Sequence, residues 1–316
     1  MNLFETKAAT KIGLTFVCGI FLLLVACAPA DNDTNTVNTS VLDLTKDTPF
    51  YIINGQEIKQ SADGFSYSIV ALFNIEDSSL CTGSIIDPNY IITAAHCLAR
   101  DPRNMVVLFG VDFEAAAKSK NFIPVADGIA NPLYNHKMDL ARQKKAIPEK
   151  NWGDIALIKI GKRLPPNYRP IPVVNLTDTT AQQETLLAGY GMYNGVKGTG
   201  SGLLRKTIVK IDNPSYSQTE ASLDQTHGTG ACHGDSGGPS YIKANTGGYA
   251  LWGVTSRGLN DPKNDCSQFS VYTKITPFRN WIIQAQKLLA TRVLPPHIPL
   301  PPKTLQGGNR LAVIPK

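Results

Sequence analysis

The 316-residue sequence lacks several patterns that mark common classes of protein. It has no long basic run beyond Arg142-Gln143-Lys144-Lys145 and a formal net charge of only +6, so a nucleic-acid partner is not expected. No internal repeat recurs at a solenoid-like period. Aromatic residues make up only 8% of the chain, against 26 glycines and 21 prolines, and this balance favours a turn-rich β protein over a helical one.

The N-terminus has the features of an export signal. Lys7 and Lys11 precede an apolar run over residues 12–26, which is too short for a comfortable membrane span and is typical of a signal peptide. The run ends in Leu-Val-Ala followed by Cys27, which resembles the lipobox of bacterial lipoproteins. We therefore predict a lipoprotein signal peptide over residues 1–26 and lipidation of Cys27, which would make the protein an exported cell-envelope lipoprotein. An ordinary signal peptide that happens to contain a cysteine is the alternative.

Two further segments are predicted to lie outside the folded domain. Residues 27–51 contain the polar stretch 31–48, which has no useful periodicity and predicts a propeptide or flexible tether. Residues 291–316 are rich in proline and cannot build a core of their own. We expect a tail there that is either disordered or draped on the surface.

Residues 52–272 contain short apolar or alternating runs between turn signals. The runs are YSIVALF, YIIT, MVVLFG, IALIKI, LLAGYG, LLRKTIVKI and ALWGVT. Many short strands with few helices predict a β-barrel or β-sandwich. One helical pattern follows, in which Phe278, Ile282, Ala285 and Leu289 share a face that we expect to pack on the β domain.

The segment ACHGDSGGPSY, residues 231–241, places Ser236 among three glycines. Glycines cannot fill a core, so the backbone must turn tightly there or be approached closely. A glycine-rich hairpin, the nucleophile elbow of α/β-hydrolases and the nucleophile loop of another serine hydrolase would each explain this pattern. The elbow requires an acid and then a histidine after the serine, but His297 in the proline-rich tail is the only histidine that follows.

Upstream motifs supply the partners that a nucleophilic serine needs. His96 lies in TAAHC after the strand-like NYII, and Asp154 lies in GDIALI at the start of another apolar run. The order His96, Asp154, Ser236 is that of the chymotrypsin-type catalytic triad.

With these motifs in place, residues 52–290 resemble a trypsin/chymotrypsin-type serine protease. IING (52–55) resembles the family's activated N-terminus, CTGSIIDPNYIITAAHC its histidine region and CHGDSGGP its nucleophile loop, and GYG (189–191) stands where the family usually has Gly-Trp-Gly. The resemblance implies an all-β fold of two six-stranded antiparallel β-barrels with a C-terminal helix. It also implies a serine-type endopeptidase that acts on protein or peptide substrates with no cofactor and no metal.

The chemistry then assigns a role to each residue. A serine hydroxyl is a poor nucleophile, so His96 would accept the proton of Ser236 while Asp154 holds the imidazole in the required tautomer. The backbone N–H groups of Gly234 and Ser236 would stabilise the oxyanion. By resemblance, Ser256 would hydrogen-bond the buried Asp154.

The sequence has six cysteines, of which one leaves with the signal peptide and one would carry lipid. The four that remain are Cys81, Cys97, Cys232 and Cys266. In an oxidising compartment they predict two disulfides with three possible connectivities. Zinc is the alternative, because two of these cysteines adjoin a histidine, but no C-x-x-C spacing supports it. The resemblance implies that Cys81 pairs with Cys97 and Cys232 with Cys266.

The substrate pocket departs from that of trypsin. Trypsin-like enzymes carry an aspartate six residues before the nucleophile, where this chain has Gly230. Gly230, Ser256, Gly258 and Ser270 would line a neutral pocket, and cleavage is expected after neutral or apolar residues because a buried ammonium without a counter-ion is costly. Arg257 occupies the usual place of a tryptophan. It is interpreted as an exposed, solvated side chain, with attraction for acidic groups as the alternative.

A second departure is an insertion at residues 136–150, ahead of the aspartate motif. We predict a surface loop with a short helix and interpret its basic stretch as a solvated face. His136, His227 and His233 are interpreted as surface or loop residues, and His233 adjoins the pocket.

The resemblance also implies a zymogen. In this family a newly formed α-ammonium inserts beside the aspartate that precedes the nucleophile, and here the pair would be Ile52 and Asp235. Cleavage between Tyr51 and Ile52 would also separate the domain from lipidated Cys27 at the membrane, so activation would release the enzyme to the periplasm or the extracellular space. The alternative is that the bond stays intact and the domain stays anchored.

Two other functions are compatible with the sequence. A catalytically silent protease homologue would use the barrels as a binding module, which requires an obstruction that the sequence does not reveal. An esterase acting on small acyl substrates would use the same acyl-enzyme chemistry.

Overall fold

The computed structural model describes residues 52–59, 64–174, 179–244 and 247–297. The predicted signal peptide, the tether, Cys27 and residues 298–316 of the tail lie outside the described residues. Every helix within the described ranges is too short or too polar to cross a membrane.

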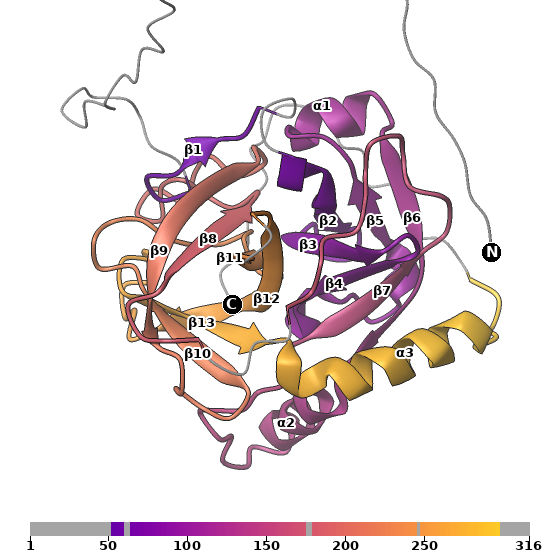
Figure 1. Ribbon diagram of the computed structural model, residues 1–316. Helices are drawn as coiled ribbons and strands as arrows, with labels where there is room; N and C mark the ends of the chain where they lie inside the picture. Colours follow the sequence, from indigo (N-terminus) through magenta and orange to yellow (C-terminus); the bar gives the residue numbers. More distant parts are fainter. Residues whose placement is uncertain (1–51, 60–63, 175–178, 245–246, 298–316) are drawn as a thin grey trace, which may run out of the picture. The chain divides into compact units, whose positions relative to one another are not determined.

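Six antiparallel strands close a first barrel in the order β2-β3-β4-β7-β6-β5 (Figure 1). They are β2 (Ile69–Asn74), β3 (Leu80–Asp87), β4 (Tyr90–Thr93), β5 (Met105–Leu108), β6 (Phe122–Ala130) and β7 (Ala156–Ile160). β2 and β4 are buried along their whole length, since their β-branched and apolar side chains suit a closed, two-sided packing environment.

A second barrel follows in the chain. Its strands are β8 (Glu184–Gly189), β9 (Arg205–Asn213), β10 (Glu220–Asp224), β11 (Pro239–Lys243), β12 (Tyr249–Leu259) and β13 (Phe269–Lys274). They run β9-β10-β13-β12-β11-β8, and the pairing of β8 with β9 closes the ring, while β1 (Gln56–Glu57) adds to the outer edge of β9. Trp252 and Tyr272 are among the largest side chains buried inside this barrel. The predicted fold of two six-stranded barrels is confirmed.

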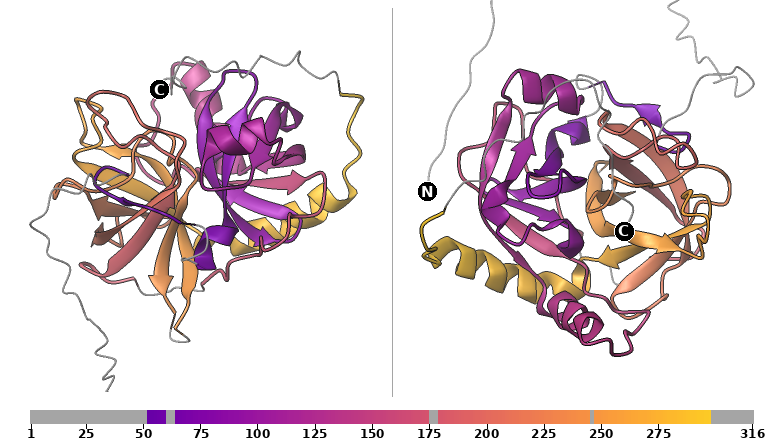
Figure 2. Two further views of the ribbon diagram at one scale, coloured as in Figure 1. Left: turned by 90° about the horizontal axis from the view of Figure 1, so that it is seen from above. Right: turned by 180° about the vertical axis from the view of Figure 1, so that it is seen from behind.

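In the described part of the chain, the α-helices are α1 (Phe113–Lys118), α2 (Pro132–Arg142) and α3 (Arg279–Thr291). Short 3-10 turns lie at η1 (Gly64–Ser68), η2 (Ala95–Cys97), η3 (Pro102–Asn104) and η4 (Thr276–Phe278). α3 lies along the first barrel (Figure 2), where Ala285 and Leu289 pack against Tyr90 and Leu157. The predicted C-terminal helix and its apolar face are therefore confirmed.

The chain beyond α3 stays on the first barrel as far as residue 297. Arg292 forms an ion pair with Asp127 of β6, and Arg103 donates to the carbonyl of Pro295 at 2.6 Å. His297 lies 3.0 Å from Asn104 Oδ1. This first part of the proline-rich segment thus contacts the surface of the domain.

The insertion before Asp154 contains the predicted helix but differs from its prediction in detail. Its helix, α2, begins earlier than expected, where Asn131 caps the first turn by accepting the N–H of Leu133 at 3.0 Å. Lys137 on α2 is only 6% exposed, because its ammonium donates to the carbonyls of Pro148 and Lys150. The basic run at residues 142–145 is exposed, as interpreted, whereas the interpretation as a solvated face is wrong for Lys137.

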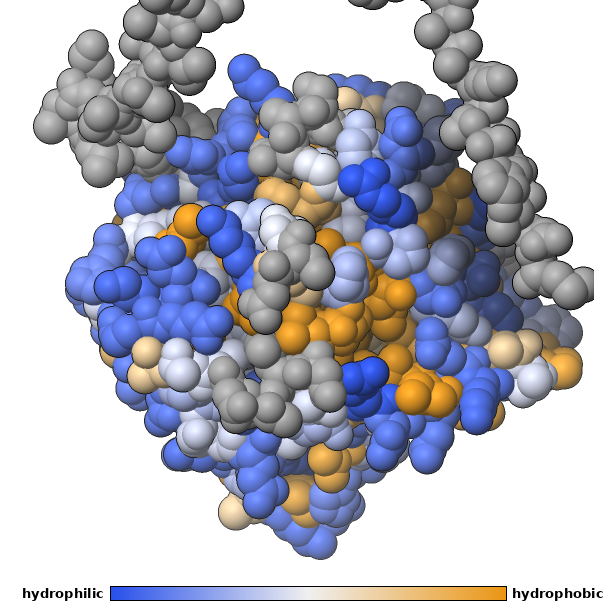
Figure 3. All heavy atoms as spheres, viewed as in Figure 1, coloured by the Kyte–Doolittle hydropathy of each residue, from blue (hydrophilic) through white to orange (hydrophobic). Residues whose placement is uncertain are grey.

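The face of the domain seen in Figure 3 is largely hydrophilic, and the apolar residues on it gather where the two barrels meet. Residues of both barrels share one apolar cluster, including Leu72 and Ile91 from the first and Leu251 and Val254 from the second. Shared burial of this kind fixes the barrels against each other, so that groups from both can face one cavity.

Candidate active site

A cavity of about 410 Å³ is lined by residues of both barrels. His96 and Asp154 line it from the first barrel, and Ser236 lines it from the loop between β10 and β11 of the second. His96 lies in η2 directly after β4, and Asp154 lies just before β7, which pairs with β4. The pairing of these strands therefore brings two residues 58 positions apart to the same edge of the first barrel.

The histidine and the aspartate are hydrogen-bonded to each other. His96 Nδ1 lies 2.8 Å from Asp154 Oδ2, and the backbone N–H of His96 donates to Asp154 Oδ1 at 3.0 Å. Ser256 Oγ donates to Asp154 Oδ2 at 2.7 Å. Burial alone would raise the pKa of Asp154, but the His96 ring and the donated hydrogen bonds hold it below its ordinary value. The buried carboxylate is therefore charged and oriented toward the imidazole.

The loop that carries Ser236 is a tight turn in which glycine is required. Gly234 has φ +97°, and a Cβ there would come within 2.9 Å of Gly191 Cα. Gly237 has φ +79°, and a Cβ there would overlap Thr93 Oγ1 of the first barrel. The carbonyl of Ser236 accepts the N–H of Thr82 at 2.8 Å, which ties the turn to β3.

The same turn presents two backbone donors. Within the described residues, the N–H groups of Gly234 and Ser236 donate to no other group of the chain. Both belong to the loop that lines the cavity with Ser236. Such a pair of uncommitted donors beside a serine is suited to hold a negatively charged oxygen.

Both disulfides implied by the family resemblance are present. Cys81 pairs with Cys97, next to His96, and Cys232 pairs with Cys266 in the wall of the cavity. The sulfurs are thereby covalently paired rather than available as thiolate ligands for zinc.

Comparison with known proteins agrees with this geometry. The trypsin family model matches residues 52–282. The chain belongs to the trypsin family. Kallikrein-8 of Rattus norvegicus is 27% identical over 254 residues, which cover 76% of this chain and 88% of the relative. Chymotrypsin of Phaedon cochleariae is 27% identical over 244 residues, which cover 75% and 82% of the two chains. The protein is thus a serine-type endopeptidase.

Gln225, rather than the predicted Gly230, contributes to the lining of the cavity in this trypsin-family protease. A Cβ on Gly230 would overlap Gln225 Cδ, and Gln225 lines the cavity while Gly230 does not. The Gln225 amide donates to the carbonyls of Ala231 and Cys266 at 3.0 and 3.1 Å and accepts the N–H of Ala231 at 2.9 Å. Sequence reasoning did not identify Gln225, because no local pattern marks a side chain that folds back under residue 230.

The remaining predicted pocket residues do line the cavity: Ser256, Gly258 and Ser270. One acidic residue that was not predicted, Asp261, lines it as well. Its carboxylate accepts the N–H groups of Cys266 at 2.7 Å and of Asp265 at 3.3 Å. Besides Asp154, the cavity of this protease is therefore lined by the neutral Gln225 and by the backbone-bound carboxylate of Asp261.

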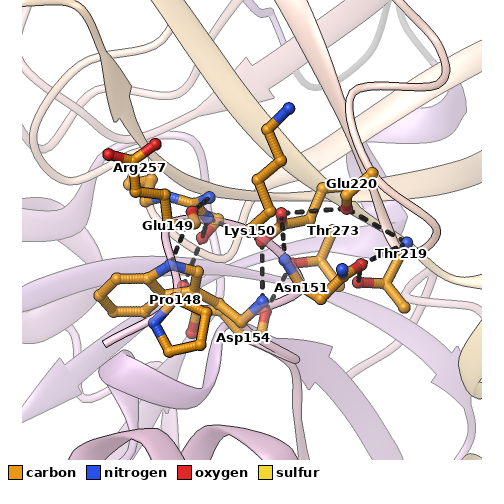
Figure 4. Close-up of polar contacts among 12 residues, drawn as sticks. Pro148, Glu149, Lys150, Asn151, Asp154, Thr219, Glu220, Arg257 and Thr273 are labelled. Carbon is orange, nitrogen blue, oxygen red and sulfur yellow. Dashed lines mark hydrogen bonds and ion pairs between the residues drawn. The ribbon is translucent and has the colours of Figure 1, made fainter. Parts of the chain in front are cut away.

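Arg257 is not the exposed side chain that the sequence suggested. Its guanidinium donates to Glu220 Oε1 at 2.9 Å and to the carbonyl of Glu149 at 2.9 Å, and only 22% of the side chain is exposed (Figure 4). It lies 5.1 Å from the ring centroid of Trp152. The interpretation as a solvated residue is wrong, because a buried carboxylate that is distant in sequence pairs with it.

Both residues of the predicted activation pair, Ile52 and Asp235, are buried. Ile52 is 1% exposed, and its neighbour Ile53 forms a bridge with Gly230. In the intact chain the nitrogen of Ile52 is a peptide nitrogen, and the Asp235 carboxylate accepts the N–H groups of Cys232 and Gly191, each at 2.8 Å. Burial raises the pKa of Asp235 to about 6, against the lowering effect of these two hydrogen bonds.

Proposed function

We propose that this trypsin-family enzyme cleaves peptide bonds through an acyl-enzyme formed on Ser236. His96 takes the proton of Ser236 as its Oγ attacks the scissile carbonyl carbon, and returns a proton to the leaving amine as the C–N bond breaks. Water then attacks the ester by the same route and releases the acid. Asp154 orients the imidazole and stabilises its positive charge, a role supported by the 2.8 Å contact with His96 Nδ1.

The N–H groups of Gly234 and Ser236 form the oxyanion hole in this proposal. Its support is that both donors are uncommitted within the described residues and lie in the loop of the nucleophile. Loss of one such donor costs about 10²–10³ in rate in enzymes of this chemistry.

The substrate preference we propose is a neutral, largely apolar residue on the acyl side of the cleaved bond (P1). Gln225 lines the cavity with its polar atoms already paired, so it offers no charge to a lysine or arginine side chain. The carboxylate of Asp261 is bound by two N–H groups in the wall. An ammonium beside Gln225 would lack a counter-ion and lose several kcal/mol of solvation.

For the whole chain we propose export, membrane anchoring and activation by proteolysis. Residues 1–26 act as the lipoprotein signal peptide, 27–51 as the tether, 52–290 as the protease domain and 291–316 as a proline-rich tail. Cys27 carries the lipid, and cleavage between Tyr51 and Ile52 frees the domain with a new α-ammonium that pairs with Asp235. The burial of Ile52 at 1% exposure, next to the bridge between Ile53 and Gly230, supports this proposal.

The observation that carries the catalytic proposal is the shared cavity of His96, Asp154 and Ser236. The test is a fluorophosphonate probe, which labels an activated serine, combined with a peptide library that reports cleavage. Processed protein should be labelled at Ser236 and should cleave after neutral residues. Correctly processed protein that neither labels nor cleaves would instead indicate a silent homologue that serves as a binding module.

A further inference from the structure

Glu220 is a buried carboxylate that belongs to the second barrel but binds a segment of the first. Its side chain on β10 has no exposed surface. Glu220 Oε2 accepts the backbone N–H of Asn151 at 2.7 Å, and Oε1 accepts that of Trp152 at 3.0 Å (Figure 4). These two N–H groups lie two and three positions ahead of Asp154, so the carboxylate holds the chain that leads to the catalytic aspartate.

Arg257 binds the segment before Asp154 as well and forms an ion pair with Glu220. One guanidinium nitrogen, Nη1, donates to Glu220 Oε1 and the other, Nη2, to the carbonyl of Glu149, each at 2.9 Å. The guanidinium lies over the ring of Trp152. Arg257 thus contacts the Glu149 carbonyl, the indole ring of Trp152 and the Glu220 carboxylate. The same carboxylate accepts the backbone N–H of Trp152.

Residues 148–152 are also held by side chains of Lys137 and Thr219. Lys137 of α2 donates to the carbonyls of Pro148 and Lys150 and lies 5.4 Å from the Trp152 ring centroid. Thr219 donates to Asn151 Oδ1 through both its N–H, at 3.2 Å, and its hydroxyl, at 3.0 Å. The loop before Asp154 is therefore fixed by side chains from α2, β12 and the start of β10.

The ion pair also touches the hydrogen bonds of the triad. Arg257 Nη1 lies 3.3 Å from Ser256 Oγ, and Ser256 Oγ donates to Asp154 Oδ2 at 2.7 Å. Burial alone would raise the pKa of Glu220, but Arg257 and the N–H groups of Trp152 and Asn151 hold it below its ordinary value. Glu220 is thus ionised at neutral pH. Its negative charge pairs with the guanidinium of Arg257, so Arg257 is not free to bind an acidic group of a substrate.

We propose that Glu220 and Arg257 are a positioning pair, which holds residues 149–152 against the second barrel and so fixes Asp154 relative to His96. The pair acts through Asp154 and does not touch the reacting atoms. The inference rests on the proposed catalytic role of Asp154. It adds that the geometry of the triad depends on an ion pair supplied by the opposite barrel.

The decisive variant is Glu220→Gln, which keeps the shape of the side chain but removes the charge that Arg257 requires. The matched control is Asp127→Asn, which breaks the ion pair with Arg292. Asp127 is also buried, at 4% exposure, but it lies on β6 beneath the end of α3 and does not line the cavity. Both variants lose one carboxylate charge from a buried ion pair, so a general loss of stability affects both.

The readout is kcat on a short ester or amide substrate that carries only a P1 residue, compared with a longer peptide. We expect kcat of Glu220→Gln to fall up to about 10²-fold on both substrates with KM little changed, because small displacements of catalytic groups have costs of this size. Asp127→Asn should keep the wild-type kcat. A loss confined to the longer peptide would overturn the proposal and assign the pair to substrate contacts, and so would a kcat equal to that of the control.

A second readout separates this inference from the proposed function. A proton on His96 Nδ1 that is hydrogen-bonded to Asp154 should give a low-field proton resonance, which can be measured without substrate. Glu220→Gln should shift or broaden it, while Asp127→Asn should not. Absence of activity in the wild-type enzyme would refute the proposed function, whereas an unchanged resonance in Glu220→Gln would refute the positioning role.

A double variant covers the case in which Glu220→Gln does not fold. Glu220→Gln combined with Arg257→Met removes both charges, so no unpaired charge remains buried, and Met still covers the Trp152 ring. The double variant should regain the thermal stability that Glu220→Gln loses. Its kcat should stay low, because the hydrogen bonds of Glu220 and Arg257 to residues 149–152 are missing. A double variant with wild-type kcat would overturn the proposal.

Discussion

Gln225 occupies the space into which a side chain at position 230 would point. A Cβ added to Gly230 would overlap Gln225 Cδ, and the amide of Gln225 is paired with the backbone of Ala231 and Cys266. Trypsin-like enzymes carry an aspartate six residues before the nucleophile, and it pairs with a lysine or arginine of the substrate. Here Gly230 stands at that position and Gln225 fills the space beside it, so the pocket has no carboxylate there.

The first prediction is that Gly230→Asp does not by itself create specificity for lysine or arginine. The new side chain must displace Gln225, and overpacking of this kind costs about 1–3 kcal/mol. We expect a lower melting temperature and a cleavage profile that still favours neutral P1 residues, measured with a peptide library. Asp261→Asn is the control for the cavity carboxylate that lies outside the proposed triad, and it should leave the P1 profile unchanged. Efficient cleavage after arginine by the wild-type enzyme would contradict the neutral pocket.

The second prediction concerns the triad. Ser236→Ala or His96→Ala should lower kcat by about 10⁶, because the members of a triad act as a unit. Labelling by a fluorophosphonate should disappear with Ser236. His297→Ala is the matched histidine control: this residue contacts Asn104 on the first barrel, and its loss should leave kcat unchanged. A large loss of kcat in His297→Ala would instead identify His297, which follows Ser236 in the chain, as the catalytic histidine.

The third prediction is a pH dependence that arises from Asp235. Its pKa is about 6 in the intact folded chain, against an ordinary value of 3.8, so between these values the folded state binds more protons than the unfolded state. The contribution of Asp235 to the free energy of unfolding is therefore full below pH 3.8 and is lost as the pH rises through about 6. Asp235→Asn should remove this component, which can be measured by denaturant unfolding of the intact chain from pH 4 to 7.

Cleavage before Ile52 should also remove this dependence on pH. A free α-ammonium beside Asp235 favours the ionised carboxylate and lowers its pKa. An intact chain and a cleaved chain with the same pH profile would contradict the pairing of Ile52 with Asp235.

Short-range patterns account for most of what the sequence predicted. Strands such as β2 and β7 are apolar runs of the right length, and the helix α3 shows its buried face in its own periodicity. The residue types of the proposed triad lie in local motifs, so His96, Asp154 and Ser236 could each be proposed from the sequence.

Long-range pairs explain what the sequence did not predict. Glu220 lies in EASLD, a five-residue stretch with one charged residue at each end, and nothing nearby indicates that Arg257, 37 positions later, neutralises it. Its residue type alone therefore predicts an exposed position for Arg257. The same reason applies to Lys137, whose carbonyl partners lie across a loop, and to Gln225, whose contact with Gly230 has no local signal in the sequence.

The last prediction is that the N-terminus of the active enzyme is Ile52. Asp235 is buried and directly precedes the nucleophile, and in the intact chain its carboxylate is bound only by backbone N–H groups among the described residues. A cut between Tyr51 and Ile52 would supply the ammonium that matches its charge and would separate the domain from Cys27. Because the P1 residue of that cut is tyrosine, the proposed neutral pocket suits it, and the enzyme could activate other copies of itself. N-terminal sequencing of purified active enzyme should give Ile-Ile-Asn-Gly, and Tyr51→Asp should slow both activation and release from membranes, whereas Tyr51→Phe should not. Active enzyme that begins at Cys27, together with full activity of Asp235→Asn, would refute the coupling of activation to release.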